Sequence, residues 1–161
     1  MIERAITSEL LTLLEEYPVI TILGPRQAGK TTLARNALKG FAYSNLESPE
    51  VRELARADPK AYLAQFRDHV IIDEIQHVPE LLSYIQVLVD QEPRNGRFIV
   101  TGSHQLQIRQ AITQSLAGRT AIFFFFPLSI AELATAGMRF DSFADYVFRG
   151  FLPGMHAQKQ R

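Results

Sequence analysis

The sequence predicts an α/β fold with three layers, in which helices cover both faces of a mostly parallel sheet. The first observation behind this prediction is that five short apolar runs alternate along the chain with segments of helical periodicity. The second is that the run Val19–Leu23, rich in β-branched residues, leads straight into a glycine-containing loop and a helix-like segment. Strands that alternate with helices in this way form parallel sheets through βαβ connections.

Composition indicates one soluble globular domain. The chain has 161 residues, of which 47% are hydrophobic and 21% are charged. Its 17 basic and 17 acidic residues cancel, so no global charge favours nucleic acid or a membrane surface. The absence of cysteine excludes disulfides and thiolate metal sites. The N-terminus lacks the apolar region of a signal peptide, and the longest apolar run, residues 121–126, is too short to span a bilayer. We therefore expect a cytoplasmic protein.

The first elements follow from helical and strand periodicity. Apolar residues recur at helical spacing within residues 4–16, which predicts an amphipathic helix. After the strand at 19–23, a helix is predicted at 32–39, where Gly40 can provide its C-cap. A second strand is predicted at 41–46.

Prolines mark the next elements. Pro49 and Pro59 each suit the first turn of a helix, which predicts helices at 49–57 and 59–66. The sequence HVIID at 69–73 predicts the third strand.

The second half repeats the alternation. A helix is predicted at 79–92, a fourth strand at 97–101, and one helix or two short ones at 104–117. The fifth strand, residues 120–126, contains four consecutive phenylalanines. Because alternate strand residues face opposite sides, we expect both faces of this strand to be covered.

The C-terminal part is predicted to contain two helices, at 130–136 and 141–149. Residues 1–149 would form the domain. The tail, residues 150–161, has little apolar content and is expected to be loose.

The loop after the first strand matches the phosphate-binding pattern G-x-x-x-x-G-K-[ST] completely. The predicted nucleotide-binding residues are Gly24, Pro25, Arg26, Gln27, Ala28, Gly29, Lys30, Thr31 and Thr32. A Cβ atom at either glycine would obstruct the turn or the approach of the phosphates. Backbone N–H groups in such a loop favour anions, with Lys30 reaching the β and γ phosphates and the Thr31 hydroxyl binding Mg²⁺. The motif predicts binding of a nucleoside triphosphate.

Two adjacent carboxylates supply the second half of the predicted site. The apolar residues 70–72 deliver Asp73 to the carboxyl edge of the sheet, where it can hold Mg²⁺ together with Thr31. Glu74 follows directly and can polarise water as a general base. This pair favours hydrolysis over transfer of the phosphoryl group to a bound hydroxyl.

Two further residues are candidates for catalysis. Ser103, which we favour over Thr101, ends the fourth strand at the active edge and could bind the γ-phosphate or orient the attacking water. The alternative for Ser103 is a plain turn at the strand end. Arg119 begins the fifth strand at the opposite edge, so it could act only in trans, as an arginine finger in a neighbouring subunit. A surface arginine near a helix C-terminus is the alternative that we favour.

These motifs resemble those of the prokaryotic AAA-like P-loop ATPases whose AAA domain precedes a C-terminal domain of unknown function. The resemblance implies a three-layer P-loop NTPase domain with a five-stranded sheet in the order 5-1-4-3-2, and it implies ATP with Mg²⁺. The matching stretches, which cover nearly the whole chain in order, are residues 24–33, 45–50, 72–76, 101–103, 116–119 and 127–129.

The chain differs from this family in length. Family members are substantially longer, and residues 149–153 resemble the point where their C-terminal domain begins. The chain therefore resembles a truncated member without that domain or a lid. In the implied sheet order the fifth strand lies at an edge, so one of its faces can have lost its cover.

The leading hypothesis is an ATP-binding protein with Mg²⁺-dependent ATP hydrolysis. The alternative is a nucleotide-binding interaction module that barely hydrolyses ATP. A small-molecule kinase is disfavoured by Asp73 and Glu74, and a GTPase by the absence of an N-K-x-D motif. Self-association or a protein partner is left open, and nucleic acid is suggested by family analogy alone.

Overall fold

The computed structural model describes residues 2–103 and 106–157, and its centre is a five-stranded parallel sheet. The order β2-β3-β4-β1-β5 is the predicted order 5-1-4-3-2 read from the other edge, so the predicted fold class is confirmed. The strands are β1 (Val19–Gly24), β2 (Ala42–Asn45), β3 (Val70–Asp73), β4 (Phe98–Ser103) and β5 (Thr120–Phe124). The register pairs Gly24 with Ser103 and Asn45 with Asp73, which brings the ends of these strands to one edge.

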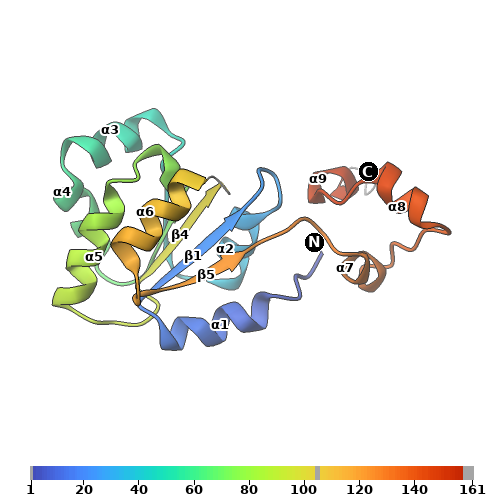
Figure 1. The fold of residues 1–161 in the computed structure, drawn as a ribbon, viewed down its shortest axis with the longest axis horizontal. Coiled ribbons are helices and arrows are strands. Elements are labelled where there is room, and N and C mark those ends of the chain that lie inside the picture. Colours follow the sequence, from blue (N-terminus) through green and yellow to red (C-terminus); the bar gives the residue numbers. More distant parts are fainter. Residues whose placement is uncertain (1, 104–105, 158–161) are drawn as a thin grey trace.

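Helices form a layer on each face of the sheet (Figure 1). One layer consists of α3 (Pro49–Ala57), α4 (Pro59–Ala64), α5 (Leu81–Gln91) and α6 (Leu106–Leu116). The other consists of α1 (Thr7–Glu16) and α2 (Lys30–Ala37). A short 3₁₀ helix, η1 (Ile75–His77), follows β3. The helix predicted from residue 104 is described from Leu106 onward, and residues 104–105 lie outside the described part.

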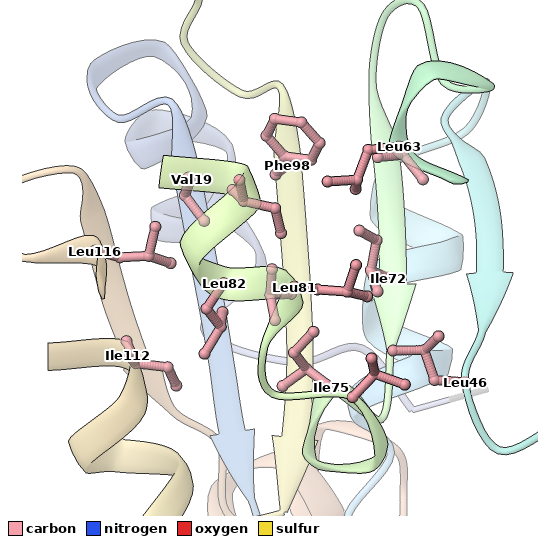
Figure 2. Close-up of a cluster of buried hydrophobic side chains, with 14 of the residues drawn as sticks. Val19, Leu46, Leu63, Ile72, Ile75, Leu81, Leu82, Phe98, Ile112 and Leu116 are labelled. Atoms are coloured by element: carbon pink, nitrogen blue, oxygen red, sulfur yellow. The ribbon is translucent and has the colours of Figure 1, made fainter. Parts of the chain in front are cut away.

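The larger core lies between the central strands and α5 and α6 (Figure 2). Val19 on β1 and Phe98 on β4 belong to this core together with Leu82 on α5 and Leu116 on α6. Every residue of β1, β3 and β4 is buried. This explains why these strands are mostly apolar, because a central parallel strand is covered on both faces. The core thereby fixes the strand ends that carry the candidate site.

The edge strand β5 differs from the expectation that both its faces are covered. Phe123 and Phe125 are buried against the α1–α2 side of the sheet. Phe124 and Phe126 point the other way and are 38% and 68% exposed. The reason is topological, since β5 is the last strand on its side and α6 packs mainly over β1 and β4.

The C-terminal part forms a small separate cluster beyond the end of β5 (Figure 1). It contains α7 (Ile130–Thr135), α8 (Phe143–Arg149) and α9 (Pro153–Ala157). Leu128, Leu133 and Tyr146 are its buried residues, and Ile2 packs against them. The tail that we expected to be loose thus includes helix α9, while residues 158–161 lie outside the described part. No helix within residues 2–103 and 106–157 combines the length and apolar character needed to cross a bilayer.

Candidate functional site

The loop between β1 and α2 has the shape of a tight phosphate-binding turn. Gln27 and Gly29 both adopt left-handed backbone conformations, with φ of 62° and 98°. Gly29 is the N-cap of α2, so the N–H groups of the first helical turn point into the loop. Ala28 is buried, whereas Pro25 and Arg26 are exposed. The left-handed turns and the start of α2 therefore present backbone N–H donors at this loop.

Gly24 is required for a reason other than the one expected from the sequence. A Cβ atom at this position would lie 2.0 Å from the backbone oxygen of Phe125. The chain leaving β5 thus runs against the start of the loop, where Phe125 N–H donates to the Leu23 carbonyl. This glycine makes room for a neighbouring backbone segment.

Lys30 is buried beneath the loop. Its Nζ donates to the carbonyl oxygens of Gly24, at 3.0 Å, and Pro25, at 2.9 Å. Burial lowers the pKa of the Lys30 ammonium, and the nearby Glu74 and Asp73 carboxylates counter that shift. The ammonium is therefore held by the loop's own carbonyls, next to two acidic residues.

Three hydroxyl groups surround the Asp73 carboxylate. The Oγ1 of Thr31 and the hydroxyl of Tyr43 each donate to Asp73 Oδ2 at 2.8 Å, and Thr101 donates to Oδ1. Burial, followed by the hydrogen bond to Asp73, raises the pKa of Tyr43. A carboxylate beside a threonine hydroxyl supplies the hard oxygen ligands that Mg²⁺ prefers, so Thr31 and Asp73 fit this ion.

Glu74 is held in place by its backbone and its side chain. It has a left-handed conformation with φ of 60°, and its N–H donates to the Thr101 hydroxyl at 3.2 Å. Its carboxylate accepts a hydrogen bond from the Gln76 carboxamide. The Gln76 Oε1 in turn accepts the Ser103 N–H at 3.1 Å. The Ser103 hydroxyl is buried and has no hydrogen-bond partner among the described residues.

Arg119 lies apart from this group of residues. It precedes β5 at the opposite edge of the sheet, and its guanidinium forms two hydrogen bonds with the Asp90 carboxylate on α5, at 2.6 and 2.9 Å. A third bond goes to the Ala117 carbonyl. An in-trans role would require this pairing to break.

Two adjoining cavities lie at the loop. The first, of about 590 Å³, is lined by polar residues of the loop, by Glu74 and by residues 152–155. The second, of about 550 Å³, is mainly apolar. Its lining includes Ile2, Leu33, Ala37, Leu128, Met138 and Pro153. The two ends of the chain thus form the walls of a space beside the phosphate-binding loop.

The Arg4 side chain contacts several of the segments that form these walls. Its guanidinium donates to the Ala28 carbonyl in the loop at 3.1 Å and to the Phe126 carbonyl at 2.7 Å. It also pairs with Glu132 on α7 at 2.9 Å and lies 4.0 Å from the Phe125 ring. A single side chain therefore joins the N-terminal segment, the loop, the end of β5 and α7.

The structure brings Lys30, Thr31, Asp73, Glu74 and Ser103 together and leaves Arg119 away from them. Sequence reasoning missed the contributions of Tyr43, Gln76, Arg4 and residues 152–155. Gln76 lies within the D-E-I-Q stretch, which could have drawn attention to it. Arg4 pairs with Glu132, which lies 128 positions further along the chain, so no local sequence pattern predicts this contact.

The fold and the geometry of the loop define a P-loop nucleotide-binding domain. The chain belongs to the family described as an AAA domain, which matches residues 16–134. Two mycobacterial relatives, the uncharacterized proteins Mb2031c of Mycobacterium bovis and Rv2008c of Mycobacterium tuberculosis, are each 33% identical over 134 residues. These residues are 83% of this chain and 30% of each relative, so the chain spans about a third of their length.

Solved structures share this fold. The Walker-type ATPase PABY2304 of Pyrococcus abyssi superposes with a TM-score of 0.60 at 19% identity, over 88% of this chain and 60% of that one. The ORC2 protein of Aeropyrum pernix, in its ADP form, gives 0.54 at 17% identity, over 82% and 49%. A STAND protein with a tetratricopeptide repeat sensor from Pyrococcus horikoshii gives 0.52 at 14% identity, over 84% and 24%. The fold of this chain is that of P-loop ATPases.

Proposed function

We propose that this domain binds ATP with Mg²⁺ and hydrolyses it. The observation that carries the proposal is the 2.8 Å contact between Thr31 Oγ1 and Asp73 Oδ2, which joins the phosphate-binding loop to the acidic strand end. In P-loop ATPases a hydroxyl and a carboxylate in these two places hold the metal. Lys30 and Glu74 line the same cavity, which supports a role for both at one bound nucleotide.

The phosphates would lie in the polar cavity over the loop. The backbone N–H groups of residues 26–32 would bind phosphate oxygens, and Lys30 would exchange the carbonyls of Gly24 and Pro25 for β and γ oxygens. Thr31 and Asp73 would hold Mg²⁺, which neutralises charge on the phosphates when bound. The nucleoside would occupy the apolar cavity between the two ends of the chain.

Glu74 is the proposed general base. It would take a proton from a water molecule as the water oxygen bonds to the γ phosphorus, while the bond from that phosphorus to the ADP oxygen breaks. Ser103 has a buried hydroxyl without a partner among the described residues, and it would donate to the γ-phosphate. Inorganic phosphate and ADP are the products.

We further propose a cytoplasmic location and a protein partner or self-association. In an assembly Arg119 could act on a neighbouring subunit only after leaving Asp90. Nucleic acid remains a suggestion from family analogy, because the net charge of zero provides no general attraction to phosphate backbones.

The test is phosphate release by the purified protein with Mg²⁺ and ATP, compared with the Glu74→Gln variant. We expect Glu74→Gln to bind ATP as the wild type does and to lose at least tenfold in turnover, within the usual range for a general base. Lys30→Ala should lose ATP binding. An unchanged rate in Glu74→Gln would refute the role of Glu74.

A second candidate function is a nucleotide-binding module with little hydrolysis. It is favoured by the hydrogen bond from Gln76 that engages the Glu74 carboxylate. ATP-dependent thermal stabilisation without phosphate release would support this alternative.

A further inference from the structure

The Gln76 side chain links Glu74 to Ser103 by two hydrogen bonds. One carboxamide makes both contacts, because its Nε2 donates to Glu74 and its Oε1 accepts the Ser103 N–H at 3.1 Å. The two residues lie on different strand ends, 29 positions apart in the sequence. Because the carboxamide is one planar group, its donor and its acceptor keep a fixed orientation relative to each other.

Gly102 leaves room for the Gln76 side chain at this contact. A Cβ atom on Gly102 would lie 3.2 Å from Gln76 Oε1 and 3.2 Å from Ile75 Cγ2, so the missing side chain at Gly102 allows the close approach. Thr101 adds a second connection, since its hydroxyl donates to Asp73 and accepts the Glu74 N–H. The ends of β3 and β4 are thus joined by side chains beyond the last residues of their ladder.

We infer that Gln76 is a positioning residue that couples the γ-phosphate group at Ser103 to the carboxylate of Glu74. The inference rests on the proposed function. The unpartnered Ser103 hydroxyl and the Ser103 N–H bound by Gln76 belong to the same residue. A γ-phosphate that accepts a hydrogen bond from the Ser103 hydroxyl therefore also fixes the position of the Ser103 N–H. Through its two hydrogen bonds, Gln76 then sets the position of the Glu74 carboxylate. ADP lacks the γ-phosphate and leaves Glu74 in the arrangement seen here.

Two substitutions separate the two hydrogen bonds of Gln76. Gln76→Met has a similar length and removes both bonds. Gln76→Glu keeps an acceptor for Ser103 but replaces the donor with a negative charge facing Glu74. Gln91→Met, on the exposed last residue of α5, is the matched control.

The first measurement is backbone amide exchange in the nucleotide-free protein, followed by NMR. We expect the Ser103 amide to exchange at least tenfold faster in Gln76→Met and at nearly the wild-type rate in Gln76→Glu and Gln91→Met. Exchange in Gln76→Met within twofold of wild type would show that the contact is not made in solution and would overturn the inference.

The second measurement is single-turnover hydrolysis at saturating ATP and Mg²⁺, together with the Kd for ADP. We expect both Gln76 variants to lose at least tenfold in rate while the Kd for ADP changes less than threefold. A purely structural role would move both quantities or neither. Wild-type turnover in either Gln76 variant would overturn the coupling.

A third measurement separates this inference from the proposed hydrolysis. If the wild type binds ATP without hydrolysing it, the proposed enzyme activity fails, and the coupling is judged from amide exchange at Glu74. An ATP analogue with a stable β,γ linkage should alter that exchange relative to ADP in the wild type and not in Gln76→Met. No difference in the wild type, or no nucleotide binding at all, would overturn the inference.

Discussion

The carbonyl oxygen of Phe125 lies 2.0 Å from the place where a Cβ atom of Gly24 would be. The first glycine of the phosphate-binding motif is therefore required by the path of the chain as it leaves β5. That path is fixed by the hydrogen bond from Phe125 N–H to the Leu23 carbonyl and by the burial of the Phe125 ring. The start of the phosphate-binding loop and the segment that leaves β5 are consequently packed against each other.

Gly24→Ala is expected to destabilise the protein by about 3 kcal/mol, because the added methyl group meets backbone atoms that cannot rotate away. Urea denaturation measures this loss. The control is Gly154→Ala, where a Cβ atom would meet nothing within 4 Å. That control should be neutral or stabilising by about 0.5 kcal/mol. Equal effects of the two substitutions would contradict the assigned contact.

Thr101→Val is expected to cost about 2 kcal/mol of stability, because it removes two hydrogen bonds. Asp73 loses the Thr101 hydroxyl as a donor, and the Glu74 N–H loses it as an acceptor. Thr21→Val is the matched control. Thr21 is also fully buried in a central strand, but the partner of its hydroxyl is the neutral Thr120 hydroxyl, at 2.9 Å. We expect it to lose about 1 kcal/mol. Chemical denaturation of both variants should give this ranking, and the reverse order would argue against the role of Thr101.

The fold could be predicted because its determinants are local. The run Val19–Leu23 and the following motif identify the central strand and α2, and the alternation of elements leads to a parallel sheet. What periodicity could not decide is the cover of β5. An apolar run looks the same at a sheet edge and in its centre, so periodicity did not indicate the exposure of Phe124 and Phe126. The edge position implied by the family resemblance did point to an uncovered face.

The site was predictable only where its residues form sequence motifs. Lys30, Thr31, Asp73 and Glu74 follow from such motifs, but the hydroxyl of Tyr43 reaches Asp73 only because β2 lies beside β3. The cavity walls depend on contacts between the two ends of the chain. Helix α9 lies in a segment with little apolar content, where sequence patterns favour a loose tail.

The Arg4–Glu132 pair should make stability depend on pH. Burial has the largest influence on the Glu132 carboxyl and raises its pKa, but hydrogen bonds from Ser129 N–H, Arg4 and Ala5 N–H outweigh it and lower the pKa below 4.5. The folded state thus favours the carboxylate. The resulting stability is fully present above pH 4.5 and is lost as the pH falls through the lower folded value.

Glu132→Gln should therefore destabilise the protein by about 2 kcal/mol at pH 7, and the difference from wild type should shrink below pH 4.5. Thermal denaturation across this pH range gives both values. Asp68→Asn removes an exposed partner of Arg94 at 3.5 Å and serves as control, with an expected change under about 0.5 kcal/mol. A difference for Glu132→Gln that is constant with pH would rule out the charge as its source.

The pairing of Arg119 with Asp90 separates a structural role from an in-trans catalytic role. If Arg119 serves only this pair, Arg119→Ala and Asp90→Ala should each leave the stability nearly unchanged, because the pair is exposed, and should leave ATP turnover unchanged. We expect this result. A loss of turnover in Arg119→Ala that Asp90→Ala does not share, and that depends on protein concentration, would instead support an arginine finger.

The apolar cavity beside Gly29 gives a test of where the nucleoside binds. Ala37 on α2 lines this cavity but not the polar one over the loop. Ala37→Phe places a ring in the proposed nucleoside space, so the affinity for ATP should fall at least tenfold while inorganic tripolyphosphate binds as before. Calorimetric titration measures both affinities. Ala64→Phe, on the exposed end of α4, should change neither affinity. Equal losses for ATP and tripolyphosphate in Ala37→Phe would show that the ring disturbs the loop itself, and wild-type affinity for both would place the nucleoside elsewhere.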